Sequence, residues 1–82
     1  MVVFGGFANG VRVNDIIKFS FADMKWSKVE ISEIRDQPCS RSGHSAVVYH
    51  NAMYVFGGKD GDNNKLNDLW RLDFSTYSWS EV

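Results

Sequence analysis

The chain has 82 residues, 44% of them hydrophobic and 23% charged, and its formal net charge is −1. This length is enough for one small domain, and the composition is ordinary for a globular protein. Because Lys and Arg are spread along the chain and form no basic patch, we expect neither nucleic-acid nor membrane-surface binding. No apolar stretch approaches the ~20 residues that a membrane-spanning helix needs.

Seven β-strands and no helix are predicted, so the expected fold class is all-β. In chain order the predicted strands cover residues 1–4, 16–21, 25–31, 44–49, 52–56, 69–74 and 77–82. The first is an apolar run that we expect to end at Gly5-Gly6, since glycine permits a bend with positive φ. The strands at 44–49 and 52–56 are apolar on both faces, which predicts a hairpin covered on both sides. Most of the others alternate between apolar and polar residues, as half-buried strands do.

The connections between these strands are predicted to separate by length. Connections in an antiparallel sheet alternate between the two ends of the strands, because successive strands run in opposite directions. The short connections lie at Ala22-Asp23, His50-Asn51 and Ser75-Thr76, and the long ones at residues 7–13, 32–43 and 59–66. All three long connections, the first of which holds the turn dipeptide Asn9-Gly10, are therefore expected at one end. Polar loops on a rigid scaffold are where recognition is usually found.

A duplication organises the whole chain. The run Met53-Tyr54-Val55-Phe56-Gly57-Gly58 restates Met1-Val2-Val3-Phe4-Gly5-Gly6 from 52 positions earlier. Asn14-Asp15 returns as Asn67-Asp68, and Trp26 as Trp79, at an offset of 53 that indicates one extra loop residue in the second copy. Similarity at a long fixed spacing indicates a repeat architecture.

These motifs resemble the kelch-repeat β-propellers. The matching residues are the two glycine pairs, the two Asn-Asp dipeptides, the two tryptophans, and Arg41-Ser42-Gly43-His44 at the opening of an inner strand. The resemblance covers essentially the whole chain and implies repeats of about 50 residues that each form a blade of four antiparallel strands. It divides the chain into residues 1–31 (the last three strands of one blade), 32–43 (an inter-blade connection) and 44–82 (a complete blade).

The first blade therefore lacks its inner strand, and Met1 aligns with a position inside a repeat. Closed propellers have typically ~4 to 8 blades. This chain supplies about one and three-quarter blades. We expect it to be either part of a larger propeller or a unit that completes itself by self-association or by docking onto the missing blades.

The repeated residues are expected to have structural roles. These residues are Gly5, Gly6, Gly57, Gly58, Asn14, Asp15, Asn67, Asp68, Trp26 and Trp79. The glycines are expected in tight bends, because a phosphate-binding loop would need a following helix and none is predicted. The tryptophans are expected to pack in the core or between blades.

No metal, cofactor or catalytic activity is expected. His44 and His50 lie six residues apart on an extended strand, a separation of roughly 20 Å, so they cannot share an ion. Cys39 is the only cysteine; with His44 it supplies two ligands at most, and no CxxC motif accompanies them. No motif singles out a catalytic nucleophile.

The lone cysteine also bears on location. A secreted domain this small usually carries several disulfides, and the sequence holds no Asn-x-Ser/Thr glycosylation site. We therefore expect a reducing compartment, the cytoplasm or the nucleus.

The partner-binding prediction falls on polar residues in and beside the long connections. They are Asn9, Arg12, Arg35, Asp36, Arg41, Lys59, Asp60, Asp62, Asn63, Asn64 and Lys65. Arg41, at the start of an inner strand, is alternatively placed as a structural partner of Asp15 or Asp68. The kelch resemblance implies a non-catalytic protein-interaction module, either a scaffold or a substrate-recognition adaptor such as those of ubiquitin ligases. The alternative is part of a kelch-propeller metalloenzyme, such as a galactose-oxidase-like oxidase, whose active site lies outside this chain.

Overall fold

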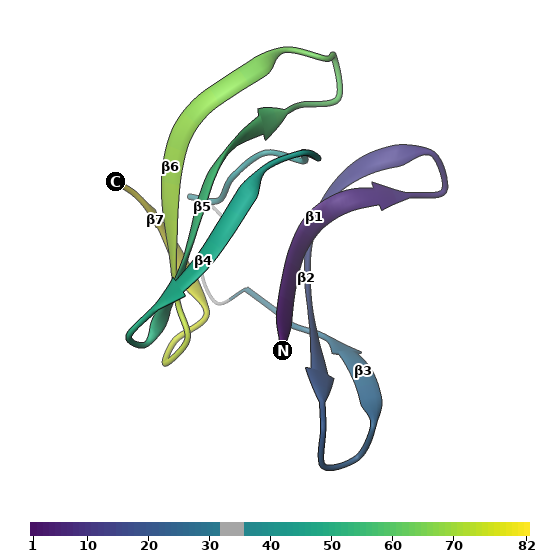
Figure 1. The fold of residues 1–82 in the computed structure, drawn as a ribbon, viewed down its shortest axis with the longest axis vertical. Helices are drawn as coiled ribbons and strands as arrows, with labels where there is room; N and C mark the ends of the chain where they lie inside the picture. Colours follow the sequence, from purple (N-terminus) through teal and green to yellow (C-terminus); the bar gives the residue numbers. More distant parts are fainter. Residues whose placement is uncertain (32–35) are drawn as a thin grey trace.

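The computed structural model describes residues 1–31 and 36–82, and it is all-β as predicted (Figure 1). The first sheet has the order β1-β2-β3, formed by β1 (Val2–Ala8), β2 (Val11–Ser20) and β3 (Lys25–Lys28). The second has the order β4-β5-β6-β7, formed by β4 (Ser45–Tyr49), β5 (Ala52–Lys59), β6 (Lys65–Asp73) and β7 (Ser78–Glu81). All pairings are antiparallel between consecutive strands. This meander is the arrangement of propeller blades.

The glycine pairs bend the strands but do not end them, so the prediction that the strands stop at Gly5-Gly6 and Gly57-Gly58 was wrong. The four glycines have positive φ values of 70°, 97°, 68° and 99°. The pairing register shifts at each pair, between Phe4 and Gly6 in β1 and between Phe56 and Gly58 in β5. A bulge of this kind inserts an unpaired residue and lets pairing resume beyond it.

Two of the predicted long loops are consequently shorter than expected. Residues 7–13 are mostly strand, and the connection between β1 and β2 is the two-residue turn Asn9-Gly10. Both turn residues have positive φ (55° and 79°), as a type I′ hairpin turn requires. The connection between β5 and β6 shrinks to residues 60–64.

The hydrophobic core lies between the two sheets. Its buried residues are Phe4, Ile16 and Val29 from the first sheet and its extension, and Met53, Val55, Trp70, Leu72 and Trp79 from the second. The ring centroid of Phe4 lies 5.0 Å from that of Trp79, in an edge-to-face contact. The second sheet supplies most of the core from one face, because alternate residues of β5 and β6 point to the same side.

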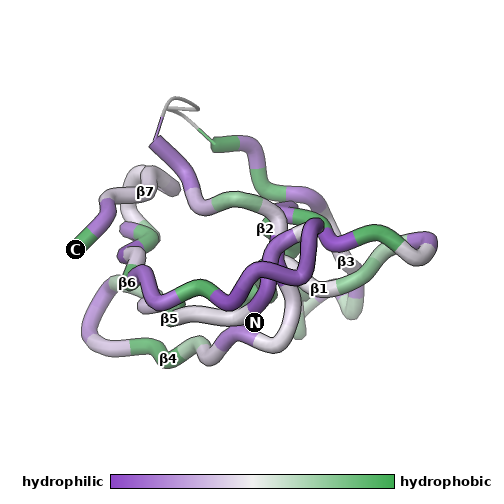
Figure 2. Tube along the Cα trace, turned by 90° about the horizontal axis from the view of Figure 1, so that it is seen from above, coloured by the Kyte–Doolittle hydropathy of each residue, from purple (hydrophilic) through white to green (hydrophobic). Residues whose placement is uncertain are grey.

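The segment 36–43 runs between the sheets on its way from β3 to β4 (Figure 2). Its backbone is hydrogen-bonded to both sheets. The Arg41 N–H donates to Val13 O at 3.1 Å, and the Gly6 N–H donates to Arg41 O at 2.7 Å. Ser42 exchanges two backbone hydrogen bonds with Lys59 of β5, at 2.9 and 3.0 Å. The connection therefore joins the first sheet to the second.

Candidate functional site

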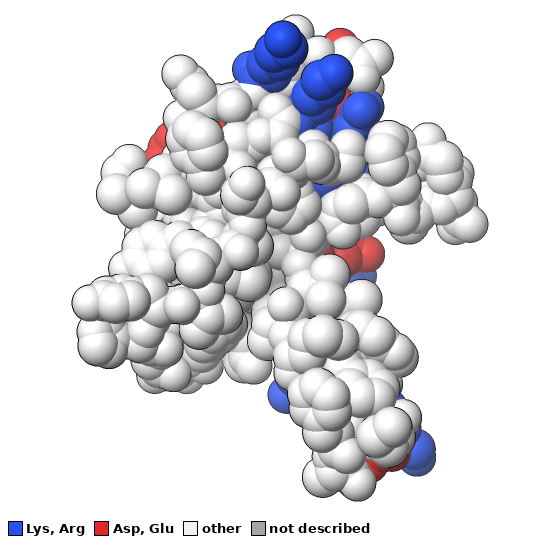
Figure 3. Space-filling view, viewed as in Figure 1, with Lys and Arg blue, Asp and Glu red and all other residues white. Residues whose placement is uncertain are grey.

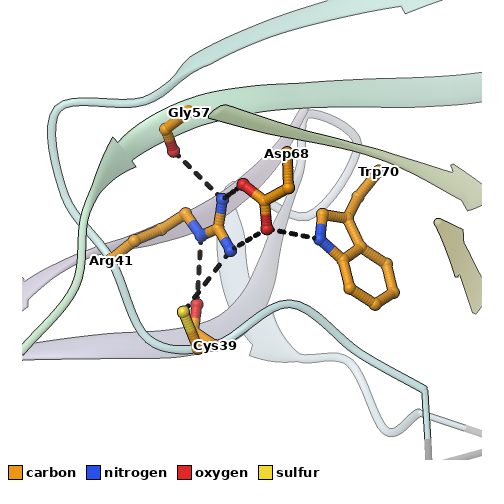
Figure 4. A network of polar contacts seen from close by, with 5 residues as sticks. All are labelled: Cys39, Arg41, Gly57, Asp68 and Trp70. Carbon is orange, nitrogen blue, oxygen red and sulfur yellow. Dashed lines mark hydrogen bonds and ion pairs between the residues drawn. The ribbon is translucent and has the colours of Figure 1, made fainter. Parts of the chain in front are cut away.

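The side chain of Arg41 is completely buried and donates several hydrogen bonds in the interior (Figure 4). Its Nη1 and Nη2 atoms donate to the two carboxylate oxygens of Asp68 at 2.7 and 2.9 Å. Nη1 also donates to Gly57 O at 3.0 Å, and Nε donates to Cys39 O at 3.1 Å. Asp68 in turn accepts a hydrogen bond from Trp70 Nε1 at 2.8 Å. The two hydrogen bonds between Arg41 and Asp68 form a bidentate pair, which is the strong form of an Arg–carboxylate interaction.

The ion pair changes the protonation equilibria of its members. The hydrogen bond from Arg41 is the main reason that the pKa of Asp68 is lowered to about 2. The same bond raises the pKa of Arg41. Nearby, burial lowers the pKa of His44, whose ring lies 5.3 Å from the ring of Phe4. The Nδ1 atom of His44 is buried without a hydrogen-bond partner, which adds to the cost of a charge there.

Arg41 was predicted to contact a partner at the surface, and its complete burial corrects that prediction. The guanidinium is used inside the molecule, by Asp68 and not by Asp15. Sequence reasoning had considered both carboxylates as partners of Arg41. The choice between them is decided by the path of segment 36–43, which carries Arg41 to the glycine bulge of β5.

Three chain segments meet at the upper end of the molecule as drawn in Figure 1. Arg12 Nε of β2 donates to Ser42 Oγ at 2.6 Å, and Ser42 is bonded to Lys59 of β5. The guanidinium of Arg12 also lies 4.8 Å from the centroid of the Phe7 ring. The ends of two hairpins and the connection between the sheets therefore meet in one surface region, which also exposes Phe7 and Val11. We call it the loop end, and define it as Asn9, Arg12, Ser42, Lys59 and residues 60–65.

The loop between β5 and β6 is ordered by Asp60. Its carboxylate accepts hydrogen bonds from the backbone N–H groups of Asp62 and Asn64, both at 2.9 Å, and from Asn64 Nδ2 at 3.2 Å. The bond from the backbone of Asn64 is the main reason that the pKa of Asp60 is lowered. Lys and Arg side chains gather at this upper end in the space-filling view (Figure 3). The loop thus presents its outer side chains from a fixed backbone.

The remaining partner-binding candidates fall into three groups. Asn9, Lys59, Asp62, Asn63, Asn64 and Lys65 are exposed at the loop end, where Arg12 and Asp60 are partly buried. Asp36 is exposed in the connection. Arg35 lies outside the described residues.

Ser42 is a member of the loop end that sequence reasoning did not select. A signal for it was present, because it lies between Arg41 and Gly43 in the motif that opens the inner strand. Gly43 has a positive φ of 71°, which turns the chain into β4. A small residue beside such a turn is a candidate for close backbone contact.

Within residues 1–31 and 36–82, no three His, Cys, Asp or Glu side chains come close enough to hold a metal ion.

A shallow hollow of about 160 Å³ lies beside the first sheet, lined by Asn14, Asp15, Ile16, Lys28, Val29, Glu30, Ile31 and Gln37. Asn14 Nδ2 donates to Pro38 O at 3.3 Å and so ties this edge to the connection. The described part of the chain contains no helix long and apolar enough to cross a membrane.

A family model, the KLHDC2/KLHL20/DRC7 Kelch-repeats domain, matches residues 1–82. The chain belongs to the kelch-repeat family. Its two antiparallel sheets, of three and four strands, are consistent with the blades of this family.

Relatives with different names share this stretch. One is the Leucine-zipper-like transcriptional regulator 1 homolog of Drosophila melanogaster, 36% identical over all of this chain and 9% of its own length. Another is the tRNA wybutosine-synthesizing protein 2/3/4 of Arabidopsis thaliana, 35% identical over 94% of this chain and 7% of its own length. A third is the Rho GTPase-activating protein gacHH of Dictyostelium discoideum, 36% identical over 99% of this chain and 5% of its own length. The chain thus spans less than a tenth of each of these proteins.

The two kelch sheets bury equivalent positions differently. Met53 and Val55, on the face of the second sheet that meets the first, are 2% and 0% exposed. Their counterparts Met1 and Val3 are 57% and 37% exposed, because none of the described strands covers that face of the first sheet. The converse holds on the other side, where Phe4 is 4% exposed and its counterpart Phe56 is 52% exposed. Each sheet therefore has one apolar face that its neighbour covers and one that is open.

Proposed function

We propose that this chain is a non-catalytic protein-interaction module of the kelch type, acting as a scaffold or as a substrate-recognition adaptor. The loop end is the surface that binds the partner. The observation that carries this proposal is the series of hydrogen bonds from Arg12 to Ser42 and between Ser42 and Lys59, which joins three segments distant in sequence into one surface region. Recognition favours loops held in this way by a rigid scaffold, because less conformational entropy is lost on binding.

The relatives support an interaction role over a shared chemistry. Their names describe a transcriptional regulator homolog, a tRNA wybutosine-synthesizing protein and a Rho GTPase-activating protein, yet each has a stretch similar to this chain. What the relatives share over this region is the repeat, and a fold by itself does not specify a reaction. The single cysteine favours the cytoplasm or the nucleus as the location of the interaction.

The second part of the proposal is that the open sheet faces dock onto further kelch blades. The contact inside the chain is the model for this docking, because the Phe4 face of one sheet covers the Met53 face of the next. A second copy, or further blades of the same ring, would place its Phe56 face on the Met1 face of this chain. Such a head-to-tail contact repeats around a ring until it closes.

A photo-crosslinking experiment tests the loop end as the binding surface. A photoreactive amino acid is placed at Asn63, in the ordered loop between β5 and β6, and in a second variant at Asn51, in the turn at the opposite end. After irradiation in cells, crosslinked proteins are identified by mass spectrometry. We expect a defined partner at Asn63 that is absent at Asn51.

Charge reversal supplies the second arm of this test. Lys59→Glu with Lys65→Glu is expected to reduce the crosslink at Asn63 by at least fivefold, because both side chains are exposed at the loop end. The matched control is Lys25→Glu with Lys28→Glu, two exposed lysines of β3. The same partner at both positions, or an equal loss in the β3 variant, would contradict the proposal.

A further inference from the structure

The loop end contains a row of three cations that come from three different strands, β2, β5 and β6. Ser42 lies opposite Lys59 in an isolated antiparallel bridge, and Lys59 lies opposite Lys65 across the β5–β6 hairpin. Residues directly opposite each other in an antiparallel pair point to the same face of a sheet. Arg12 continues the row, because its Nε donates to Ser42 Oγ at 2.6 Å. The fold therefore gathers three cations that are spread along the sequence.

The two lysines of this row are a like-charge pair without a counter-ion. Both side chains are exposed, and neither ammonium has a hydrogen bond or an ion pair with residues 1–31 or 36–82. Like charges directly opposite each other destabilise a sheet. Asp60 follows Lys59 directly, but its carboxylate accepts hydrogen bonds from the backbone of its own loop. An anion from outside the chain would remove the repulsion.

Arg12 is held with two of its three guanidinium nitrogens unoccupied. Its Nε is bonded to Ser42 Oγ, and the group lies over the Phe7 ring, 4.8 Å from the ring centroid. In the described part of the chain neither η nitrogen has a partner. A guanidinium can bind both oxygens of one carboxylate through two parallel N–H groups. Because the side chain is already fixed, little rotamer entropy is lost when a carboxylate binds.

We propose that the loop end binds an extended acidic segment of a partner protein. One carboxylate of the segment pairs with the η nitrogens of Arg12, and a second lies between Lys59 and Lys65. One and a half strand spacings, about 7 Å, separate Ser42 from the midpoint of the two lysines. Alternate side chains of an extended peptide share a face at roughly the same spacing, so the two acidic residues are two positions apart. This assignment rests on the proposed function and names the chemistry of the partner.

The acidic residues of the loop favour a short acidic segment over a phosphate-rich chain such as nucleic acid. The loop end carries three positive side chains and two negative ones, Asp60 and Asp62. A long polyanion would extend past the row and meet the exposed carboxylate of Asp62. A segment with two carboxylates uses the cations without that repulsion. Phe7, which is 62% exposed, adds an apolar contact for the residue beside the first carboxylate.

A peptide titration tests the proposal. The probe is the peptide Gly-Leu-Glu-Ser-Glu-Gly with blocked ends and an uncharged fluorescent label, and the reference peptide has glutamine in place of both glutamates. Binding to the chain is followed by fluorescence anisotropy. We expect saturable binding of the glutamate peptide and affinity at least about tenfold lower for the glutamine peptide. The difference should shrink as salt is raised, because exposed charges are screened.

Variants of the row separate binding from folding. Lys59→Gln with Lys65→Gln should lower the affinity for the glutamate peptide about tenfold and leave the melting temperature unchanged or higher, because a like-charge pair is removed. Arg12→Lys keeps the charge but loses the bidentate bond, and should lower the affinity about fivefold. The matched control is Lys25→Gln with Lys28→Gln, two exposed lysines of β3, which should leave the affinity unchanged.

Four results would overturn the proposal. They are the absence of saturable binding up to millimolar peptide, equal binding of the glutamine peptide, an equal loss in the β3 variant, and tighter binding of a thymidine oligonucleotide of the same length. The crosslinking experiment at Asn63 tests the proposed function separately. A partner captured there that binds through a segment without acidic residues would leave the proposed function standing and contradict the acidic segment alone.

Discussion

Trp26 and Trp79 hold the same position in the two kelch sheets, yet Trp26 is 54% exposed and Trp79 only 5%. Each indole lies beside an equivalent residue of the neighbouring strand, Phe19 for Trp26 and Leu72 for Trp79. What differs is the next sheet: Phe4 covers Trp79 at 5.0 Å between ring centroids. Trp26 has Phe19 at a similar distance, within its own sheet. The open face around Trp26 is therefore equivalent to an interface that the molecule already uses once.

We predict that the 82-residue chain associates at tens of micromolar. Each large apolar side chain left in water forfeits roughly 1.5–3 kcal/mol of burial free energy, against a typical net stability of ~5–15 kcal/mol. Both open faces carry several such side chains, including Trp26 on one and Phe56 on the other. Sedimentation velocity over a range of concentrations measures the association.

The faces responsible can be identified by substitution. Trp26→Lys or Phe56→Lys should shift the sedimentation profile toward monomer, because each puts a charge into one half of the head-to-tail contact. Val11→Lys is the control, since Val11 is at least as exposed as Trp26 and Phe56 but lies at the end of the β1–β2 hairpin. A cooperatively folded monomer of the parent chain would argue against docking through these faces.

Asp68 is expected to be essential to stability, and its counterpart Asp15 dispensable. Asp68→Asn leaves the buried Arg41 charge without its carboxylate, which should lower the free energy of unfolding by about 2–4 kcal/mol. Asp15→Asn should change it by less than about 0.5 kcal/mol, because Asp15 is exposed. Urea unfolding at one fixed protein concentration compares the two variants. Equal losses would mean that Asp15 has the structural role that the repeat predicts for it.

The same ion pair predicts a loss of stability in acid. The pKa of Asp68 is about 2 in the folded chain, below its ordinary value of 3.8. The unfolded chain therefore takes up a proton first, and the stabilisation, present in full above about pH 4, disappears as the pH falls toward 2. The effect is about 1–2 kcal/mol after allowance for the partial exposure of Asp68. Unfolding curves of the parent chain should show this loss, and those of Asp68→Asn should lack it.

His44 predicts a second pH dependence, at a higher pH. Burial lowers its pKa below 6.5, so the unfolded chain binds a proton there more readily than the folded chain. Stability should therefore decrease as the pH falls below about 6.5. A melting series between pH 7.5 and 5 measures this decrease, and His44→Gln should flatten it. His50→Gln is the control, because His50 is exposed. If His50→Gln flattens the dependence of the melting temperature on pH as much as His44→Gln does, the assignment to His44 is wrong.

Gly58 is predicted to be intolerant of any side chain. A Cβ atom there would lie 2.7 Å from Ser42 O and 3.0 Å from His44 N, and the residue has a φ of 99°. Gly58→Ala should therefore cost at least about 1–3 kcal/mol and loosen the contact between Ser42 and Lys59. Gly61→Ala is the matched control in the neighbouring loop, where a Cβ would meet nothing within 4 Å. Thermal melts of the two variants that coincide would show that this close approach is not needed.

The all-β class, the seven strands and the duplication could be predicted from the sequence, because they depend on local signals. Alternation of apolar residues, positive-φ glycines and turn dipeptides such as Asn9-Gly10 act over a few residues, and each is present twice or more. The strand ends were less accurate. Glycine pairs signal a bend, but whether pairing resumes beyond the bend depends on the partner strand, and here β2 and β6 both continue past it.

The burial of Arg41, the choice of Asp68 over Asp15 and the difference between Trp26 and Trp79 were decided only by the tertiary structure. In the sequence each of the two aspartates directly follows an asparagine, and each of the two tryptophans directly precedes a serine. Local patterns cannot separate such pairs, because their environments are created by segments far away in the chain. The connection 36–43 brings a guanidinium to one carboxylate and leaves the other exposed, and the first sheet covers one indole while nothing in the described chain covers the other.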